Sequence, residues 1–137
     1  MLFRSCTDRG DLAAWLASAD LYVSAMADET FGISIVEAQA SGLPVVGVAA
    51  GAMVDRVPDG LGLVGAVDDA DAMAANIIAV LGDDMAAMGE AARAHALHFS
   101  WDQSMARLFG HVYRSAMERA AIRARTASAR PSAFASA

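Results

Sequence analysis

Short apolar runs alternate with segments of helical hydrophobic period along most of the chain, and this alternation constrains the fold more than any other feature. Short buried strands that are each followed by a helix are typical of parallel βα units. Strands are expected at residues 1–3, 20–25, 44–50 and 62–65, and helices at 11–19, 32–41, 69–81, about 84–97 and 101–124. We therefore predict an α/β fold, with a Rossmann-like parallel sheet of three to four strands, flanking helices and further C-terminal helices.

The end of the chain carries its own signals. Ser100, followed by Gln103 three residues later, is a capping-box pattern that indicates the start of the last helix, which Phe99 and Trp101 are expected to anchor. Residues 126–137 are mostly small and polar, which is typical of a disordered tail. The predicted organisation is one partial lobe with closing helices over 1–125 and a disordered tail over 126–137.

Composition argues against several classes of protein. The longest apolar run, LPVVGVAAGAMV, is broken by Pro44 and by glycines, and it is too short to span a bilayer. The beginning of the chain lacks a signal-peptide pattern and the lone Cys6 cannot form an internal disulfide, so a cytoplasmic location is the default expectation. Residues 1–98 carry four arginines against 14 acidic residues, a net charge of −10, which argues against nucleic-acid binding.

The C-terminal part is basic instead, because residues 99–137 carry six arginines against two acidic residues, a net charge of +4. Five of these arginines lie in the last predicted helix or directly after it: Arg107, Arg114, Arg119, Arg123 and Arg125. Two interpretations are open: a solvated helix face, or peripheral contact with anionic lipid at the inner membrane face.

Ligands of open parallel sheets bind beyond the carboxyl ends of the strands, where the βα loops converge. The loop at 24–32 delivers Glu29, Thr30, Phe31 and Gly32 to the start of the next predicted helix. Free N–H groups and the helix dipole favour a phosphate there, and Gly32 would let it approach the main chain. The sequence therefore predicts an anion-binding site at the start of this helix.

A second carboxylate lies just over one turn inside the same helix, where Glu37 follows Glu29 by eight residues. The apolar helix residues expected to be buried are Ile33, Ile35, Val36, Ala38 and Ala40. A carboxylate on a mostly buried helix needs polar partners, and two ribose hydroxyls would suit Glu37. Glu29 would then receive hydroxyls from the group that the phosphates carry. The alternative is that both glutamates are surface residues, since acidic side chains early in a helix stabilise its dipole.

The segment ADLYVSAMADETFGISIVEAQASGLPVVGVAAGAMVDRV resembles the donor-binding motif of retaining, two-lobed glycosyltransferases of family 4, which have the GT-B fold. That motif has a Glu, seven residues and a second Glu, with Phe-Gly after the first and EA-A-GLPVV around the second. The matching residues here are Glu29, Phe31, Gly32, Glu37, Ala38, Ala40, Gly42, Leu43, Pro44, Val45 and Val46. The similarity continues through DGLGLV and FSWDQSMARLFGHVYRSAM and covers roughly residues 1–118.

The resemblance implies a hexosyltransferase that moves a sugar from a nucleoside diphosphate donor to an acceptor with retention, without a metal or other cofactor. Glu37 would hold the nucleotide ribose, and Glu29, the candidate catalytic residue, would face the donor sugar. The implied donor-binding residues are Glu29, Thr30, Phe31, Gly32, Ile33 and Glu37. The stretch ETFGISIVEAQASG is also similar to mannosyltransferases that use GDP-mannose. The family often has two glycines, a proline and a glutamate after its third strand, whereas residues 51–55 are GAMVD, which leaves the shape of that loop open.

By the same resemblance, the chain begins inside the second, donor-binding lobe of a two-lobed enzyme. The N-terminal acceptor lobe would be a missing partner, together with a basic residue on the diphosphate that neither Arg4 nor Arg9 is placed to replace. This chain alone is then expected to be inactive. Two other interpretations stay open: a non-catalytic nucleotide-sugar-binding or partner module, and an inactive truncated remnant.

Other candidate sites have weaker support. His95 and His98 lie three residues apart on a predicted helix, a spacing that a metal can use, but no third ligand is evident nearby and no metal site is predicted. Cys6 belongs to no nucleophile pattern, so we expect a small packing residue there.

Overall fold

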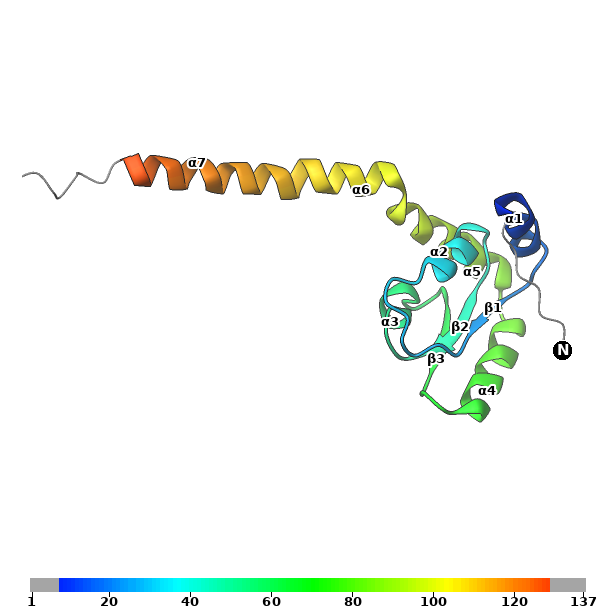
Figure 1. Cartoon of the computed structure of the whole chain (residues 1–137). Coiled ribbons are helices and arrows are strands. Elements are labelled where there is room, and N and C mark those ends of the chain that lie inside the picture. Colours follow the sequence, from blue (N-terminus) through cyan, green and yellow to red (C-terminus); the bar gives the residue numbers. More distant parts are fainter. Residues whose placement is uncertain (1–7, 129–137) are drawn as a thin grey trace, which may run out of the picture. The chain divides into compact units, whose positions relative to one another are not determined.

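The computed structural model describes residues 8–128, which form two compact units divided between Phe99 and Ser100. The elements of the first unit are α1 (Arg9–Ala17), β1 (Tyr22–Ser24), α2 (Ile33–Ala40), β2 (Val45–Val48), α3 (Met53–Arg56), β3 (Gly62–Gly65), α4 (Ala70–Leu81), α5 (Met85–Ala96) and the 3₁₀ helix η1 (Leu97–Phe99). Those of the second unit are α6 (Trp101–Arg107), the π-helical η2 (Leu108–Tyr113) and α7 (Arg114–Ser128). Figure 1 labels the helices and strands.

The strands form one parallel sheet in the order β1-β2-β3. Its register places Val45 of β2 beside Tyr22 of β1 and Gly62 of β3. The central strand β2 is buried at every position, as expected of a parallel strand that is covered on both faces. The predicted α/β fold, with a parallel sheet and flanking helices, is therefore confirmed. The strand expected at residues 1–3 lies outside the described residues.

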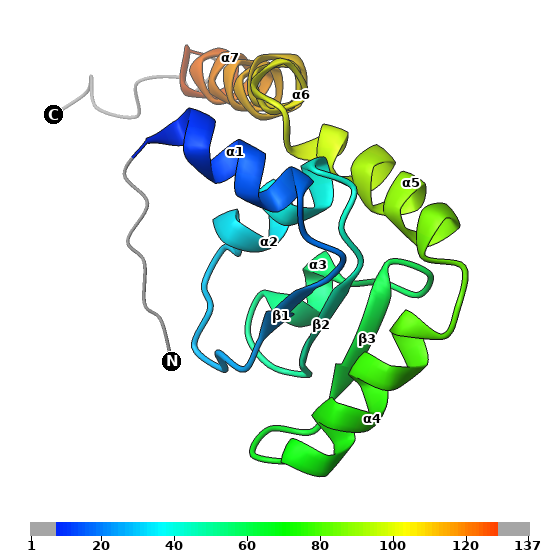
Figure 2. The ribbon, with the colours of Figure 1, turned by 90° about the vertical axis from the view of Figure 1, so that its right-hand side faces the viewer.

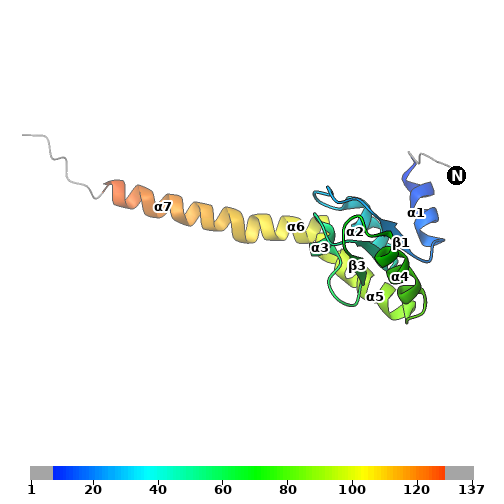
Figure 3. The same ribbon diagram turned by 90° about the horizontal axis from the view of Figure 1, so that it is seen from below.

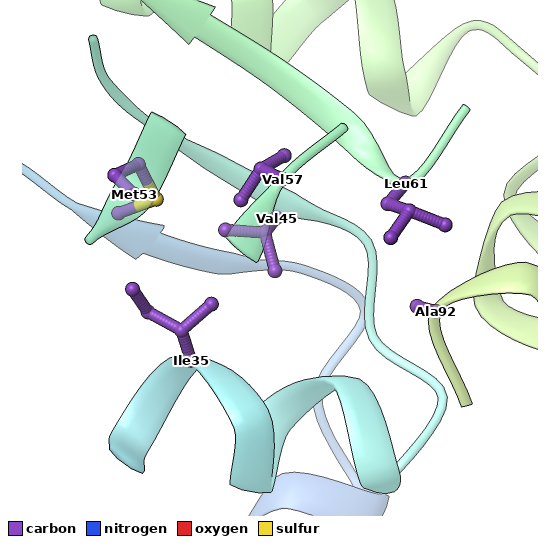
Figure 4. Packing of buried hydrophobic residues seen from close by; sticks show 6 residues of the cluster. All are labelled: Ile35, Val45, Met53, Val57, Leu61 and Ala92. Atoms are coloured by element: carbon purple, nitrogen blue, oxygen red, sulfur yellow. The ribbon is translucent and has the colours of Figure 1, made fainter. Parts of the chain in front are cut away.

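Helices cover both faces of this sheet. α4 packs on β2 and β3, and α2 and α3 pack on β2 from the other side, where α2 also contacts α5. In Figure 2, α4 lies beside the lower end of β3, and α2 and α3 lie on the other side of the strands. The main hydrophobic cluster comprises Ile35, Val45, Met53, Val57, Leu61 and Ala92 (Figure 4). Each Å² of apolar surface removed from water stabilises the folded chain by about 25 cal/mol. Because the cluster contains residues of α2, α3 and β2, its burial holds both helices against the sheet.

Aspartate and serine side chains cap four helices. Asp8 accepts hydrogen bonds from two backbone amides at the start of α1, at 2.7 and 3.0 Å. Asp69 and Asp84 cap α4 and α5 in the same way. Ser100 Oγ accepts from the backbone N–H of Gln103 at 3.3 Å, as the capping-box pattern predicts for the start of α6. Each cap satisfies an amide that the helix leaves without a partner, which is typically worth about 1 kcal/mol.

The burial of α2 differs from the expectation at three positions. Ile35 is 1% exposed as predicted, but Ile33 is 61% exposed and Ala40 is also exposed. Gln39 is fully buried in their place, and its Nε2 donates to the backbone carbonyl of Arg56 at 2.5 Å. A polar side chain can be buried when it meets a backbone partner, and that partner comes from α3, a helix that the sequence pattern did not predict.

The second unit is a single helical stretch. α6, η2 and α7 run on as one rod in Figures 1 and 3. This confirms a helix over 101–124, but α7 continues to Ser128, so the predicted tail cannot begin at residue 126. The boundary between the two compact units, after Phe99, falls inside the span predicted as one lobe with closing helices over 1–125. Trp101, expected to anchor this helix, is 80% exposed, and residues 129–137 lie outside the described residues.

Within residues 8–128, no single helix combines the length and apolar composition that a membrane crossing requires. α4 together with Met85–Phe99 passes that test as a pair, but the two helices are bent by 103°.

Candidate functional site

The loop between β1 and α2 is held from behind by the segment that follows β2. The backbone N–H of Ala52 donates to the carbonyl of Glu29 at 2.7 Å. Gly51 has a φ of +53° and lies so close to the loop that a Cβ there would meet the carbonyl oxygens of Glu29 and Ala27. A side chain at residue 51 would therefore push the loop away, so glycine is required by both conformation and contact.

Glu29 caps the start of α2. Its Oε1 accepts from the backbone N–H of Gly32 at 2.9 Å. Gly32 itself is the N-cap residue in a left-handed conformation, with φ +79°, and it is buried. The amides of Ile33, Ser34 and Ile35 have no acceptor inside the helix, since the first turn of any α-helix leaves its N–H groups unpaired. The start of α2 is thus rich in donors and already attracts one carboxylate.

The other residues predicted at this end are open to solvent. Thr30 is exposed, Phe31 is 49% exposed and Ile33 is 61% exposed. The backbone from Glu29 to Ile33 therefore lies at the carboxyl edge of the sheet, as the sequence predicted, with Gly32 as its buried member. The structure brings Glu29 and Gly32 into direct contact.

Glu37 lies in a different setting, in a hollow between α1 and α2. The hollow has a volume of about 180 Å³, and its lining residues are Arg9, Leu12, Ala13, Leu16, Glu37, Ala40 and Ser41. Figure 2 shows α1 running beside α2. Arg9 Nη1 forms an ion pair with Glu37 Oε1 at 2.7 Å, and the side chains are 81% and 29% exposed respectively. Glu29 is not among the residues that line this hollow.

Ser34 and Ser41 lie three residues before and four residues after Glu37 and form a polar stripe with it, and each serine has its own partner. Tyr22 Oη donates to Ser34 Oγ at 2.8 Å, which ties α2 to β1. Ser41 Oγ donates to the backbone carbonyl of Glu37 at 3.0 Å. Of this stripe, Glu37 and Ser41 line the hollow, whereas Ser34 helps to fix the helix on the sheet.

A cationic side chain that the sequence pattern did not single out lies behind the loop. Arg56, at the end of α3, donates from Nε to the carbonyl of Phe31 at 2.9 Å. Its guanidinium carbon lies 4.7 Å from the ring centroid of Phe31 and 4.4 Å from that of Phe99. No local sequence signal indicates these contacts, because they join residues from three separate elements.

The two histidines of α5 and η1 pack at the edge of this group. The ring of His95 lies 5.3 Å from that of Phe99 and 6.1 Å from that of His98. Burial lowers the pKa of His95 below 6.5, and the charges of His98 and Arg56 lower it further. Within residues 8–128, no group of three or more His, Cys, Asp or Glu side chains is arranged to hold a metal ion.

A family model described as "Glycosyl transferases group 1" matches residues 4–83, which is more than half of the chain. The chain belongs to this family. Among curated members, the chain is 40% identical over 111 residues to D-inositol 3-phosphate glycosyltransferase 1 of Catenulispora acidiphila, covering 79% of this chain and 26% of that protein. It is 40% identical over 112 residues to D-inositol 3-phosphate glycosyltransferase of Corynebacterium kroppenstedtii, covering 80% of this chain and 25% of that protein.

Two solved structures share the fold of this chain. The chain superposes on sucrose-phosphate synthase from Thermosynechococcus elongatus with a TM-score of 0.73 and 29% identity, covering 86% of this chain and 30% of the other. A glycosyltransferase from Rickettsia africae gives a TM-score of 0.66 and 27% identity, covering 84% and 31%. The predicted assignment to the GT-B glycosyltransferases is confirmed, and the chain spans about a quarter of the length of the curated relatives it matches.

Proposed function

We propose that the first unit binds the nucleoside diphosphate sugar donor of a glycosyl transfer reaction. The carrying observation is that one helix, α2, presents a donor-rich N-terminus beside Glu29 and, one turn later, a carboxylate that lines a hollow. Ile33 and Glu37 are about 6 Å apart along the helix axis, because each helical residue advances about 1.5 Å. A single ligand can therefore reach both ends of this arrangement.

In this proposal, the diphosphate lies on the free amides at the start of α2, where the helix dipole favours negative charge. The nucleoside enters the hollow between α1 and α2, and its ribose hydroxyls donate to Glu37. Arg9 would share or give up the carboxylate at small cost, since an ion pair with an 81% exposed partner contributes little free energy. Ser41 supplies a second polar atom at the same wall.

Glu29 is proposed to face the donor sugar. Its hydrogen bond to Gly32 uses Oε1, and a carboxylate has further lone pairs that can accept sugar hydroxyls. Once phosphate oxygens bind the amides of α2, they compete with Glu29 for the N–H of Gly32 and release the carboxylate toward the sugar. The backbone from Thr30 to Ile33, in which Gly32 is buried and the other three residues are exposed, would line the path between phosphate and sugar.

The finer parts of the proposal rest on the sequence resemblance. They are a GDP-mannose donor, retention at the anomeric carbon, and transfer without a metal or other cofactor. An acceptor site on an N-terminal lobe also rests on the resemblance. A cytoplasmic location and peripheral contact with anionic lipid through the C-terminal arginines rest on composition and charge instead. A chain that binds donor without turnover fits both this fragment of an enzyme and the non-catalytic binding module, whereas a chain that binds no donor fits the inactive truncated remnant.

Calorimetric titration with GDP, UDP and their sugars tests the donor site. We expect binding that Glu37→Gln weakens about tenfold, because a charge-assisted hydrogen bond is worth about 1.5–3 kcal/mol. Glu90→Gln is the matched control, since Glu90 is an exposed glutamate of α5 outside the hollow. Absence of binding to every nucleotide, or equal losses in Glu37→Gln and Glu90→Gln, would contradict the proposal.

A further inference from the structure

One peptide unit at the start of α2 is held at both ends by side chains of opposite charge. The carbonyl oxygen of Phe31 accepts from Arg56 Nε at 2.9 Å. The N–H of the same peptide, which belongs to Gly32, donates to Glu29 Oε1 at 2.9 Å. Because a trans peptide is planar and its C=O and N–H point in opposite directions, the two contacts fix its orientation.

The guanidinium of Arg56 has several partners besides the Phe31 carbonyl. Its guanidinium lies over the rings of Phe31 and Phe99, which meet each other edge to face with centroids 6.3 Å apart. The negative face of each aromatic ring attracts the cation, so both rings help to hold the guanidinium in place. The side chain is half-buried, and within residues 8–128 no carboxylate lies within ion-pair distance of its guanidinium. Its positive charge is therefore directed at the Phe31 carbonyl and the two rings.

The backbone of α3, which carries Arg56, is hydrogen-bonded both to α2 and to the loop that precedes α2. The backbone carbonyl of Arg56 accepts from the buried Gln39 of α2 at 2.5 Å. At the other end of α3, the Ala52 N–H donates to the Glu29 carbonyl at 2.7 Å. A short helix that is joined to α2 and to the preceding loop can position a side chain against that loop with little freedom.

We propose that Arg56 is a positioning residue that orients and polarises the Phe31–Gly32 peptide so that the Gly32 N–H can receive the diphosphate of the donor. This inference rests on the proposed donor-binding function. A cation on the carbonyl oxygen strengthens the N–H at the other end of the same peptide as a donor, because hydrogen-bonded dipoles polarise one another. Glu29 occupies that N–H in the free protein and leaves it when phosphate oxygens take its place.

The variants that test this role are Arg56→Met, Arg56→Lys and, as a matched control, Arg114→Met. Methionine keeps the length of the arm without charge, and lysine keeps the charge without the planar guanidinium that fits between two rings. Arg114 is an exposed arginine of the second unit, so its replacement leaves the loop untouched.

The first readout is amide hydrogen exchange of the full chain by NMR, without ligand. We expect protection of the Gly32 and Ala52 amides to fall about tenfold relative to α4 amides in Arg56→Met and Arg56→Lys, because a hydrogen bond that fixes the peptide is lost. Arg114→Met should leave this ratio unchanged. If the ratio is also unchanged in both Arg56 variants, or if all amides lose protection equally, the positioning role is wrong.

The second readout separates positioning from general stability. The affinity for GDP divided by that for guanosine, and likewise for UDP and uridine, measures what the diphosphate contributes. We expect this ratio to fall about tenfold in Arg56→Met while nucleoside affinity is kept. Equal losses for nucleoside and nucleotide would contradict the inference. A wild-type chain that binds no nucleotide would refute the proposed function, and exchange at Gly32 would still decide whether Arg56 holds the peptide.

Discussion

Arg9 Nη1 lies 2.7 Å from Glu37 Oε1, so the carboxylate that the sequence marks for a ribose has a cationic partner in the free protein. The two residues come from α1 and α2 and close one side of the hollow between these helices. At the proposed donor site, a ligand that donates to Glu37 would have to share the carboxylate with Arg9.

Arg9→Gln should therefore affect the ligand site more than the fold. The free energy of unfolding is expected to change by less than about 1 kcal/mol, because exposed ion pairs are worth about 0–1 kcal/mol. Denaturant unfolding measures this change. Nucleotide affinity should depend less on salt in the variant than in the wild type, and an equal salt dependence would contradict competition between Arg9 and the ligand.

Gly32→Ala should destabilise the chain by about 1–2 kcal/mol, because alanine is strained in the left-handed region. A Cβ there would also lie 2.9 Å from Ile35 Cδ1 and crowd the start of α2. Gly60→Ala is the matched control, since Gly60 has φ +88° with no atom within 4 Å of its Cβ position. Equal losses in urea unfolding would show that crowding at Gly32 contributes nothing.

Gln39→Met should lower the free energy of unfolding by about 1 kcal/mol, since it removes the hydrogen bond to the Arg56 carbonyl while nearly keeping volume. Gln39→Glu should cost more than about 2 kcal/mol, because a carboxylate at a fully buried position loses hydration and meets an acceptor. Thermal unfolding of both variants shows which one loses more stability. A Gln39→Glu protein as stable as the wild type would contradict the burial of this side chain.

His95 should make stability depend on pH. Burial, followed by His98 and Arg56, lowers its pKa below 6.5, so the unfolded chain takes up a proton at a higher pH than the folded chain does. The stabilisation is complete above about pH 6.5 and is lost as the pH falls from there toward the lower folded pKa. His95→Gln should flatten the curve of unfolding free energy against pH in this window. If the difference in unfolding free energy between the wild type and His95→Gln does not vary with pH, His95 is not the group responsible.

The second unit should promote self-association. Trp101, Phe109 and Met117 are 80%, 61% and 70% exposed, and large apolar side chains gathered on one helix favour contacts between molecules. Phe109→Glu and Met117→Glu should shift the sedimentation profile of the full chain toward monomer. The control is Ala116→Glu, which adds the same charge at a small exposed residue. A monodisperse wild-type monomer would contradict the prediction.

Much of the fold could be predicted from local patterns. The strand at 20–25 and the strand at 44–50 were found because apolar runs bounded by turn residues indicate buried parallel strands. The helix at 32–41 was found from its period and its end signals. α3 was missed, since Met53–Arg56 is too short to show a helical period and forms where Met53 and Val57 pack into the core.

Some residues of the candidate site could also be predicted from local sequence, and others could not. Gly32 and the glutamates could be proposed as site residues because Glu29 precedes α2, Glu37 lies one turn inside it, and the segment resembles the donor-binding motif of the family. Arg9 and Arg56 could not, since neither carries a local signal for the residue that it contacts. The surroundings of the two glutamates also depend on packing, since Glu37 lines the hollow beside α1 while Glu29 contacts Gly32.

The sequence alone determined the order of strands and helices, the parallel sheet and the place where a phosphate would find free amides, because these follow from period, turn chemistry and the geometry of a helix start. Only the tertiary structure decided which charges surround that place. Arg9 reaches Glu37 across 28 residues of chain and Arg56 reaches Phe31 across 25, and such contacts exist only after separate elements have buried their apolar faces against one sheet.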